Sequence, residues 1–181
     1  MREGRNSHRV ALFFQNYITE NNIGTAEILD LKAYNFPLFE ERLQYTKDPS
    51  PAVLEFSSKV RSADGIIVVT PEYNGGYPAA LKNVVDLLYP EWKKKPVAIA
   101  TVSDGQFGGT QVIYSLVFSF FKIGALLVPA MFPVPKVQEH YDEEGKPLDK
   151  DAINKRAKHF IGELVWCAKA RKMMETETGN K

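Results

Sequence analysis

The apolar residues follow two different spacings along the chain, and these spacings predict helices and strands. Residues 10–18 place their apolar side chains on one helical face, which predicts a first helix capped by Asn6 or Ser7 and ended by residues 21–24. Continuous β-branched or apolar runs indicate strands, and the run at 66–69 has the pattern of a strand covered on both faces. The predicted strands are 66–69, 97–102 and 126–128, with a shorter strand-like run at 26–31.

Helices and buried strands therefore alternate along the sequence. The remaining helices are expected to start at Pro51 and Pro78 and to cover residues 110–124 and 149–172. Such alternation predicts an α/β fold with a parallel sheet and helices on both faces, because parallel neighbours need crossover connections. Ligands of these folds bind outside the carboxyl ends of the strands. The segments of interest are therefore 70–78, 103–110 and the residues before the first helix.

Composition narrows the class of protein. The 181 residues, 44% apolar and 25% charged, predict a single domain over 1–174 and a disordered polar tail over 175–181. A net charge of +1 without a basic stripe argues against a nucleic-acid or membrane-surface partner. Polar residues interrupt the most apolar stretch, 112–128, so we expect no membrane span. With Cys167 as the one cysteine and no signal-peptide pattern, a cytoplasmic setting is expected.

The segment that leads into the first helix has the composition of an anion site. Residues 2–8 combine a glycine, two arginines and small polar residues directly before a helix. Free N–H groups, the helix dipole and an arginine favour a phosphate there, with Arg2, Asn6 and Ser7 as candidate contacts. A capped, solvated N-terminus is the alternative, and this segment taken alone favours it.

The segment after the 66–69 strand can bring main-chain atoms close to a flat ligand. Asn-Gly-Gly at 74–76 permits positive φ, so no Cβ stands between the backbone and a ring. Tyr73 and Tyr77 are candidates to pack against that ring. A simple strand-to-helix turn is an equally good interpretation of this segment alone. The candidate ring contacts are Pro71, Glu72, Tyr73, Asn74 and Gly75.

The segment after the 97–102 strand is also rich in glycine and opens a helix. Its glycines allow the backbone to fold around a ring with several N–H groups turned toward it. A glycine-rich loop is weak support by itself, but three such segments at one end of a parallel sheet strengthen one another. The candidate residues here are Ser103, Gly105, Phe107, Gly108 and Gly109.

Residues 71–86, Pro-Glu-Tyr-Asn-Gly-Gly-Tyr-Pro-Ala-Ala-Leu-Lys-Asn-Val-Val-Asp, resemble the signature of the NADPH-dependent FMN reductase family. Residues 96–109 are similar to the second flavin loop of that family, and 2–7 to its phosphate loop. The resemblance implies a flavodoxin-like doubly wound parallel sheet that binds FMN and uses NADPH or NADH as co-substrate. It implies main-chain contacts to the ring from 71–75 and phosphate contacts from 2–7. For Glu72 it implies that position matters more than charge.

One departure from the family concerns the start of the sheet. In the family a short strand precedes the phosphate loop and is central in the strand order 2-1-3-4-5. Here Met1 stands where that strand should just have ended. We therefore expect either that this chain is shorter than the natural protein or that other residues rearrange to fill the gap.

The sequence thus predicts an FMN-dependent oxidoreductase that passes electrons from NAD(P)H to a small acceptor such as a quinone, an azo compound, a metal ion or free flavin. Hydride transfer through a flavin requires no catalytic side-chain pair. The alternatives are a flavodoxin-type FMN carrier or storage protein and a non-catalytic interaction module that has lost flavin binding. The apolar helix within 112–123, together with the resemblance, predicts a homodimer or homotetramer.

Overall fold

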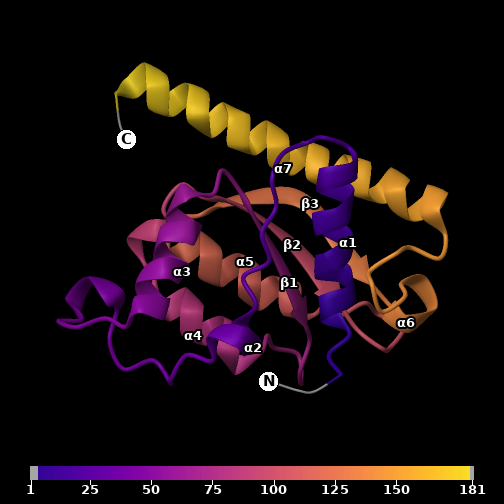
Figure 1. The fold of residues 1–181 in the computed structure, drawn as a ribbon, viewed down its shortest axis with the longest axis horizontal. Coiled ribbons are helices and arrows are strands. Elements are labelled where there is room, and N and C mark those ends of the chain that lie inside the picture. The colour runs from indigo at the N-terminus through magenta and orange to yellow at the C-terminus, as the bar shows by residue number, and fades with distance from the viewer. Residues whose placement is uncertain (1–3, 180–181) are drawn as a thin grey trace.

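The structure is a computed structural model, and it describes residues 4–179. Within that range, a parallel sheet with the strand order β1-β2-β3 forms the centre of the molecule (Figure 1). β1 pairs with β2 from Ile66 opposite Val97 to Pro71 opposite Val102. β2 pairs with β3 from Pro96 opposite Leu126 to Val102 opposite Val134, with one irregularity near Ala98. The strands are β1 (Ile66–Pro71), β2 (Pro96–Val102) and β3 (Leu126–Val134).

The helices confirm most of the predicted segments. α3 begins at Pro51 as predicted, and Ser50 caps it, since the Ser50 side chain accepts a hydrogen bond from the Val53 N–H. The longer helices are α1 (Ser7–Glu20), α3 (Pro51–Ser62), α4 (Ala79–Leu87), α5 (Val112–Lys122) and α7 (Lys150–Thr178). The short ones are α2 (Leu31–Tyr34), α6 (Val137–His140) and the 3-10 turns η1 (Leu43–Tyr45) and η2 (Pro90–Trp92).

Two apolar cores cover the two faces of the sheet. α1 and α7 lie on one face of the sheet, and α3, α4 and α5 lie on the other (Figure 1). Their buried side chains form one core on each face. β2 lies between the two cores, and each of its residues is buried. Its Ala98 and Ala100 belong to the core under α1 and α7, whereas Val97 and Ile99 belong to the opposite core. The predicted α/β architecture with helices on both faces is therefore confirmed.

The strand-like run predicted at 26–31 is wrong. Residues 24–30 have no regular secondary structure, and the chain enters α2 at Leu31. Asp30 caps α2 by accepting the Lys32 N–H at 2.8 Å, and Lys59 of α3 pairs with Glu27 at 2.6 Å. The helix cap and the ion pair fix the position of this segment, whereas a strand would be fixed by hydrogen bonds to a neighbouring strand. The β-branched and apolar content of the run could not reveal this.

The position of β1 also differs from the prediction. Its apolar run has the pattern of a strand covered on both faces, yet β1 is an edge strand of the sheet among residues 4–179 and is partly exposed at four of its six positions. No described residue fills the position of the family's first strand beside it. The order β1-β2-β3 therefore matches the last three strands of the predicted 2-1-3-4-5 arrangement.

Two elements extend further than predicted. β3 runs to Val134 instead of ending near Val128; it forms the other edge of the described sheet and carries prolines at 129 and 133, which edge strands tolerate. α7 continues to Thr178, so residues 175–178 of the predicted disordered tail are helical. Residues 180–181 lie outside the described range. No helix among the described residues is long and apolar enough to cross a membrane.

Candidate functional site

The three segments singled out in the sequence lie at one end of the sheet. Pro71 and Val102 are opposite each other at the carboxyl ends of β1 and β2, so the two following loops leave the sheet side by side. The segment before α1 reaches the second of these loops, because the Asn6 Nδ2 donates to Asp104 Oδ1 at 2.9 Å. The structure therefore brings the predicted loops together at the edge where parallel folds bind ligands.

The loop after β1 is a tight hairpin. The Tyr73 N–H donates to the Gly76 carbonyl at 2.8 Å, and the Gly76 N–H donates to the Tyr73 carbonyl at 3.0 Å. Asn74 and Gly75 have φ values of 52° and 78°, as a two-residue turn of the I′ type requires. The tip consists of these two residues, so the main chain at 74–75 projects from the end of the sheet without bulky side chains.

The two tyrosines of this loop have different surroundings. Tyr73 is exposed at the tip and stays a candidate for packing against a ring. Tyr77 instead packs against the core under α5, and its hydroxyl lies 2.8 Å from Ser119 Oγ. Ser119 Oγ already donates to the Ser115 carbonyl, so the Tyr77 hydroxyl is the donor of the pair. The interpretation of Tyr77 as a ring contact is therefore corrected.

The loop after β2 is anchored to the chain beyond β3. The Ser103 hydroxyl donates to the Gly105 carbonyl at 2.8 Å, and that carbonyl also accepts the Lys136 N–H at 3.1 Å. Gly108 has a φ of 64°, and a Cβ there would lie 3.1 Å from the Pro133 Cβ. Phe107 is 74% exposed. The loop therefore has a defined path, and its glycine at 108 is required both by conformation and by space.

A side-chain contact joins the two loops. Glu72 Oε2 accepts the backbone N–H of Gln111, directly before α5, at 3.1 Å. A Cβ on Gly109 would lie 3.4 Å from the Glu72 Cβ and 3.5 Å from the Thr101 Cβ. Thr101 is fully buried, and its hydroxyl has no hydrogen-bond partner in the described part of the chain. The Glu72 side chain thus has a specific partner, Gln111, while the expectation that its position matters more than its charge stays a prediction.

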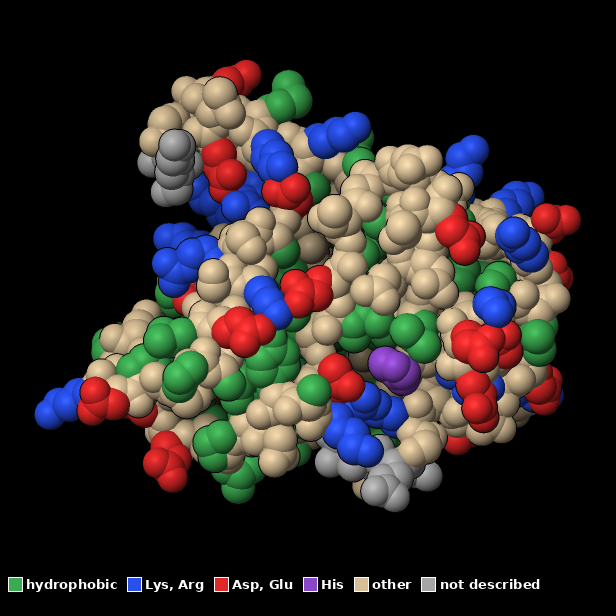
Figure 2. Space-filling view, viewed as in Figure 1, with side chains coloured by type: hydrophobic (Ala, Val, Ile, Leu, Met, Phe, Trp, Pro, Cys, Tyr) green, Lys and Arg blue, Asp and Glu red, His purple; other side chains and the backbone are tan. Residues whose placement is uncertain are grey.

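The segment before α1 is engaged with carboxylates. Arg5 forms a two-pronged ion pair with Asp30, with one N–O distance of 2.6 Å, and this contact lowers the pKa of the Asp30 carboxyl. Asn6 holds Asp104, and Ser7 is the first residue of α1. Figure 2 shows Lys and Arg side chains gathered near the end of α1 where the chain enters it. Arg2 lies outside the described residues, so its phosphate role stays a prediction.

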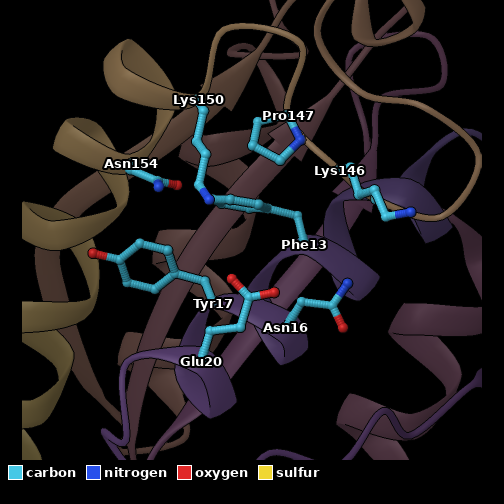
Figure 3. Close-up of a pocket in the computed structure, with 9 residues that line it drawn as sticks. Phe13, Asn16, Tyr17, Glu20, Lys146, Pro147, Lys150 and Asn154 are labelled. Carbon is cyan, nitrogen blue, oxygen red and sulfur yellow. The ribbon is translucent and has the colours of Figure 1, made fainter.

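Two recesses in the surface differ in their distance from the three loops. An open recess of about 320 Å³ borders the start of α5 and lies next to the hairpin tip, since a Cβ on Gly75 would be 3.6 Å from Gln111 Oε1. Its lining residues are Thr110, Gln111, Ile113 and Tyr114. A smaller recess of about 40 Å³ lies between α1, the turn at 145–147 and α7 (Figure 3), and none of the three loops lines it. The larger recess is therefore the one connected with the site.

The geometry suits a flat, polar ring. Main-chain atoms at 74–75 and 108–109 can approach such a ring because these positions have positive φ and little or no side-chain bulk. Thr101 Oγ1, Asp104 and Gln111 are three features that sequence reasoning did not select. Asp104 lies inside a predicted loop, but its contact with Asn6, 98 residues away in the chain, has no sequence signal.

Comparisons with known proteins show the family of the chain. The profile of the NADPH-dependent FMN reductase family matches residues 1–139. An NAD(P)H-dependent FMN reductase of Schizosaccharomyces pombe is 52% identical over 65 residues, which are 36% of this chain and 30% of that protein. Alignments with two further fungal FMN reductases cover 48% and 44% of those proteins. The chain thus matches half or less of the length of these fungal relatives.

Other similar proteins are covered more completely. The quinone reductase of Escherichia coli K12 is 37% identical over 137 residues, covering 72% of this chain and 71% of that enzyme. The solved structure of FerB, a flavoenzyme NAD(P)H:(acceptor) oxidoreductase from Paracoccus denitrificans, has a TM-score of 0.75 over 93% of both chains at 21% identity, which shows a shared fold. By its profile match and its flavodoxin-like architecture, the chain belongs to the NADPH-dependent FMN reductase family.

Proposed function

We propose that the protein is an FMN-dependent oxidoreductase that takes hydride from NADPH or NADH and passes electrons to a small acceptor. The observation that carries this proposal is the meeting of two glycine-bearing loops through Glu72 and Gln111 at the carboxyl ends of β1 and β2. This edge is the usual ligand position in doubly wound folds. The family match supports FMN as the ring that the loops hold.

The protein residues orient the cofactor and leave one side of it accessible. When bound, FMN supplies the redox chemistry, since it can accept a hydride and release two electrons. The main chain at 71–75 and at 103–109 makes the ring contacts in this proposal. The exposed Tyr73 and Phe107 border the ring, where they exclude water beside a stacked nicotinamide.

The phosphate of FMN is assigned to the segment before α1. Asn6 and Ser7 lie at the start of a 14-residue helix whose dipole favours an anion, and Arg2 stays a predicted contact. Arg5 forms an ion pair with Asp30, so we assign it to holding the segment in position and not to binding the phosphate. Asp104, held by Asn6, adds a negative charge next to this position and opposes the phosphate.

The names of similar proteins support a proposal for the acceptor class. Similar proteins are named quinone reductase and NADPH azoreductase, so we propose a small aromatic or quinonoid electron acceptor. The proposed compartment is the reducing cytoplasm, because Cys167 is the chain's single cysteine.

Steady-state kinetics with NADPH and a benzoquinone test this proposal against a flavodoxin-type carrier. An enzyme whose two substrates use the same ring in turn gives parallel double-reciprocal lines when both are varied. FMN that stays bound without NADPH oxidation would favour the carrier. A chain that neither retains FMN nor oxidises NADPH would favour the non-catalytic interaction module.

We also propose that a second copy of the chain covers the outer face of α5. Tyr114, Phe118 and Phe121 follow one another at helical spacing and are 83%, 68% and 71% exposed. This aromatic stripe is continuous with the recess at Thr110, which a single chain leaves open on one side. Sedimentation should show a dimer or tetramer. Phe118→Glu should dissociate this oligomer, whereas Trp166→Glu, which changes an exposed side chain of α7, should leave it intact. A monomer at micromolar concentration would contradict this.

A further inference from the structure

We propose that Glu72 is a positioning residue with two separable effects on the bound flavin, one from its hydrogen bond and one from its charge. The hydrogen bond fixes the positions of the two ring-binding loops relative to each other. The charge disfavours the reduced form of the cofactor relative to the oxidised form. This inference rests on the proposed binding of FMN.

The geometry supports a role for the hydrogen bond. Glu72 follows the last residue of β1, and its carboxylate reaches the Gln111 N–H, 39 residues further along the chain, at 3.1 Å. The Gln111 side chain in turn borders the hairpin tip, where its Oε1 is 3.6 Å from the position of a Cβ on Gly75. One carboxylate therefore ties the hairpin to the start of α5.

α5 itself contributes no acidic residue at its start. Gln111 is the N-cap residue, its side chain makes no capping hydrogen bond, and the first turn of α5 contains no acidic residue. Glu72 therefore supplies the negative charge that the helix dipole favours at this end, an interaction typically worth about 0.3–1 kcal/mol at an exposed site. A bound ring held by the same two loops lies in the field of this carboxylate.

A second polar group marks the same junction. Thr101 lies on β2 beneath the loop, fully buried, with a hydroxyl that has no partner among the described residues. Its Cβ is 3.5 Å from the position of a Cβ on Gly109, and Glu72 Cβ is 3.4 Å from that same position. Unpaired buried hydroxyls are costly and uncommon, so this one is consistent with a ligand that completes the site.

The charge effect follows from the electron count. Hydride transfer moves two electrons and one proton from NADPH, which leaves as NADP⁺, so the cofactor site gains one negative charge. A carboxylate at the start of α5 repels that added charge and offsets the stabilisation that the helix dipole would give. Removal of the carboxylate charge should therefore favour the reduced form.

Two substitutions at this position separate the effects. Glu72→Gln keeps an acceptor for the Gln111 N–H and removes the charge, whereas Glu72→Ala removes both. For Glu72→Gln we expect the affinity for oxidised FMN to change by less than about twofold and the reduced form to bind about tenfold more tightly, a midpoint shift of about +30 mV for a two-electron couple. Glu72→Ala should in addition weaken binding of oxidised FMN several-fold.

The measurements are dye-coupled potentiometry of the FMN-loaded protein and fluorescence titration with oxidised FMN. Asp86→Asn is the matched control, because it removes one carboxylate charge from α4 at an ion pair with Lys82. An unchanged potential in Glu72→Gln, or the same shift in Asp86→Asn, would overturn the charge effect while leaving FMN binding established.

Amide exchange supplies a readout that needs no cofactor. The Gln111 N–H should exchange faster in Glu72→Ala than in Glu72→Gln, because only glutamine keeps its acceptor. Equal exchange rates in the two variants would overturn the hydrogen-bond role. Failure of the unaltered protein to bind FMN would overturn both this inference and the proposed function.

Discussion

The two loops that follow β1 and β2 differ from the segment that leads into α1 in how the rest of the protein uses them. The loops are fixed by contacts at their bases, and the main chain of 74–75 projects from the end of the sheet. In the described part of the segment before α1, Arg5 binds Asp30 and Asn6 binds Asp104. In the proposed site, the loops therefore offer the ring a preformed backbone, whereas a phosphate competes with contacts inside the protein.

This difference shows why the ring site and the phosphate site should respond differently to substitution. Changes in the loops alter backbone paths that a ligand cannot restore. Changes before α1 alter charges that a bound phosphate can compensate. Predictions for the loops are consequently about shape, and predictions for the segment before α1 are about electrostatics.

The largest effect is expected at Gly108. An alanine there would have to adopt a φ of 64° and place its Cβ 3.1 Å from Pro133 and 3.2 Å from the Pro135 nitrogen. Left-handed backbone costs a non-glycine residue about 1–2 kcal/mol, so Gly108→Ala should lose about that much unfolding free energy. The close contacts of the new Cβ would also displace the main chain that holds the ring, so FMN affinity should fall about tenfold, a loss of about 1.4 kcal/mol in binding free energy.

Gly24 provides a control outside the proposed site. A Cβ at this position would contact nothing within 4 Å and Gly24 has no positive φ, so Gly24→Ala should change FMN affinity by less than about twofold. Fluorescence titration with FMN and urea unfolding measure both variants. Equal losses of FMN affinity at 24 and 108 would contradict the claim that the loop after β2 has one required path.

A smaller effect, of opposite sign, is expected at Asp104. Asp104→Asn keeps an acceptor for Asn6 and removes a negative charge beside the proposed phosphate position. An exposed charge pair contributes at most about 1 kcal/mol, so FMN affinity should rise about two- to fivefold at low salt. The rise should disappear at about 1 M salt, where charges are screened over a few ångströms.

Riboflavin, which lacks the phosphate, is the control ligand for this substitution. Its affinity should not change in Asp104→Asn. An equal gain for riboflavin and FMN would show that Asp104 acts on the ring or on loop stability, and it would place the phosphate elsewhere.

The smallest effect concerns the ion pair of Asp30 with Arg5. The hydrogen bond from Arg5 lowers the pKa of Asp30 in the folded state, so the pair stabilises the fold at pH above about 4, the ordinary aspartate pKa. This stability is lost as the pH falls through the lowered pKa. Asp30→Asn should cost at most about 1 kcal/mol at pH 6, and the difference should shrink at acidic pH. A difference that is independent of pH in urea unfolding would contradict this role.

The sequence predicted the parts of the fold that depend on local spacing. Pro51 marked the start of α3, and the run at 97–102 marked a strand that is buried on both faces. The run at 26–31 is also partly apolar but forms no strand, because Asp30 caps α2 and Glu27 pairs with Lys59. The cap is local, but the ion pair joins residues 27 and 59, which no local pattern could predict.

The residues of the candidate site also fall into a part that local sequence could predict and a part that it could not. Asn74 and Gly75 were predictable, because an Asn-Gly pair favours positive φ wherever it lies. Tyr77 was misassigned, since its contact with Ser119 depends on how α5 packs beside the hairpin. The Glu72–Gln111 hydrogen bond was missed for the same reason. The backbone conformation of a turn can be predicted from its own residues, whereas the partners of its side chains depend on how distant elements pack.

The most direct test of the central claim is the visible spectrum of the purified chain after FMN is added and the excess is removed by gel filtration. NADPH is then added without oxygen. We expect one retained FMN per chain, with a yellow absorption that NADPH bleaches. The Gly108→Ala variant should retain markedly less FMN than Gly24→Ala. A colourless protein after gel filtration, or equal retention in both variants, would contradict the claim that the loops after β1 and β2 hold the flavin.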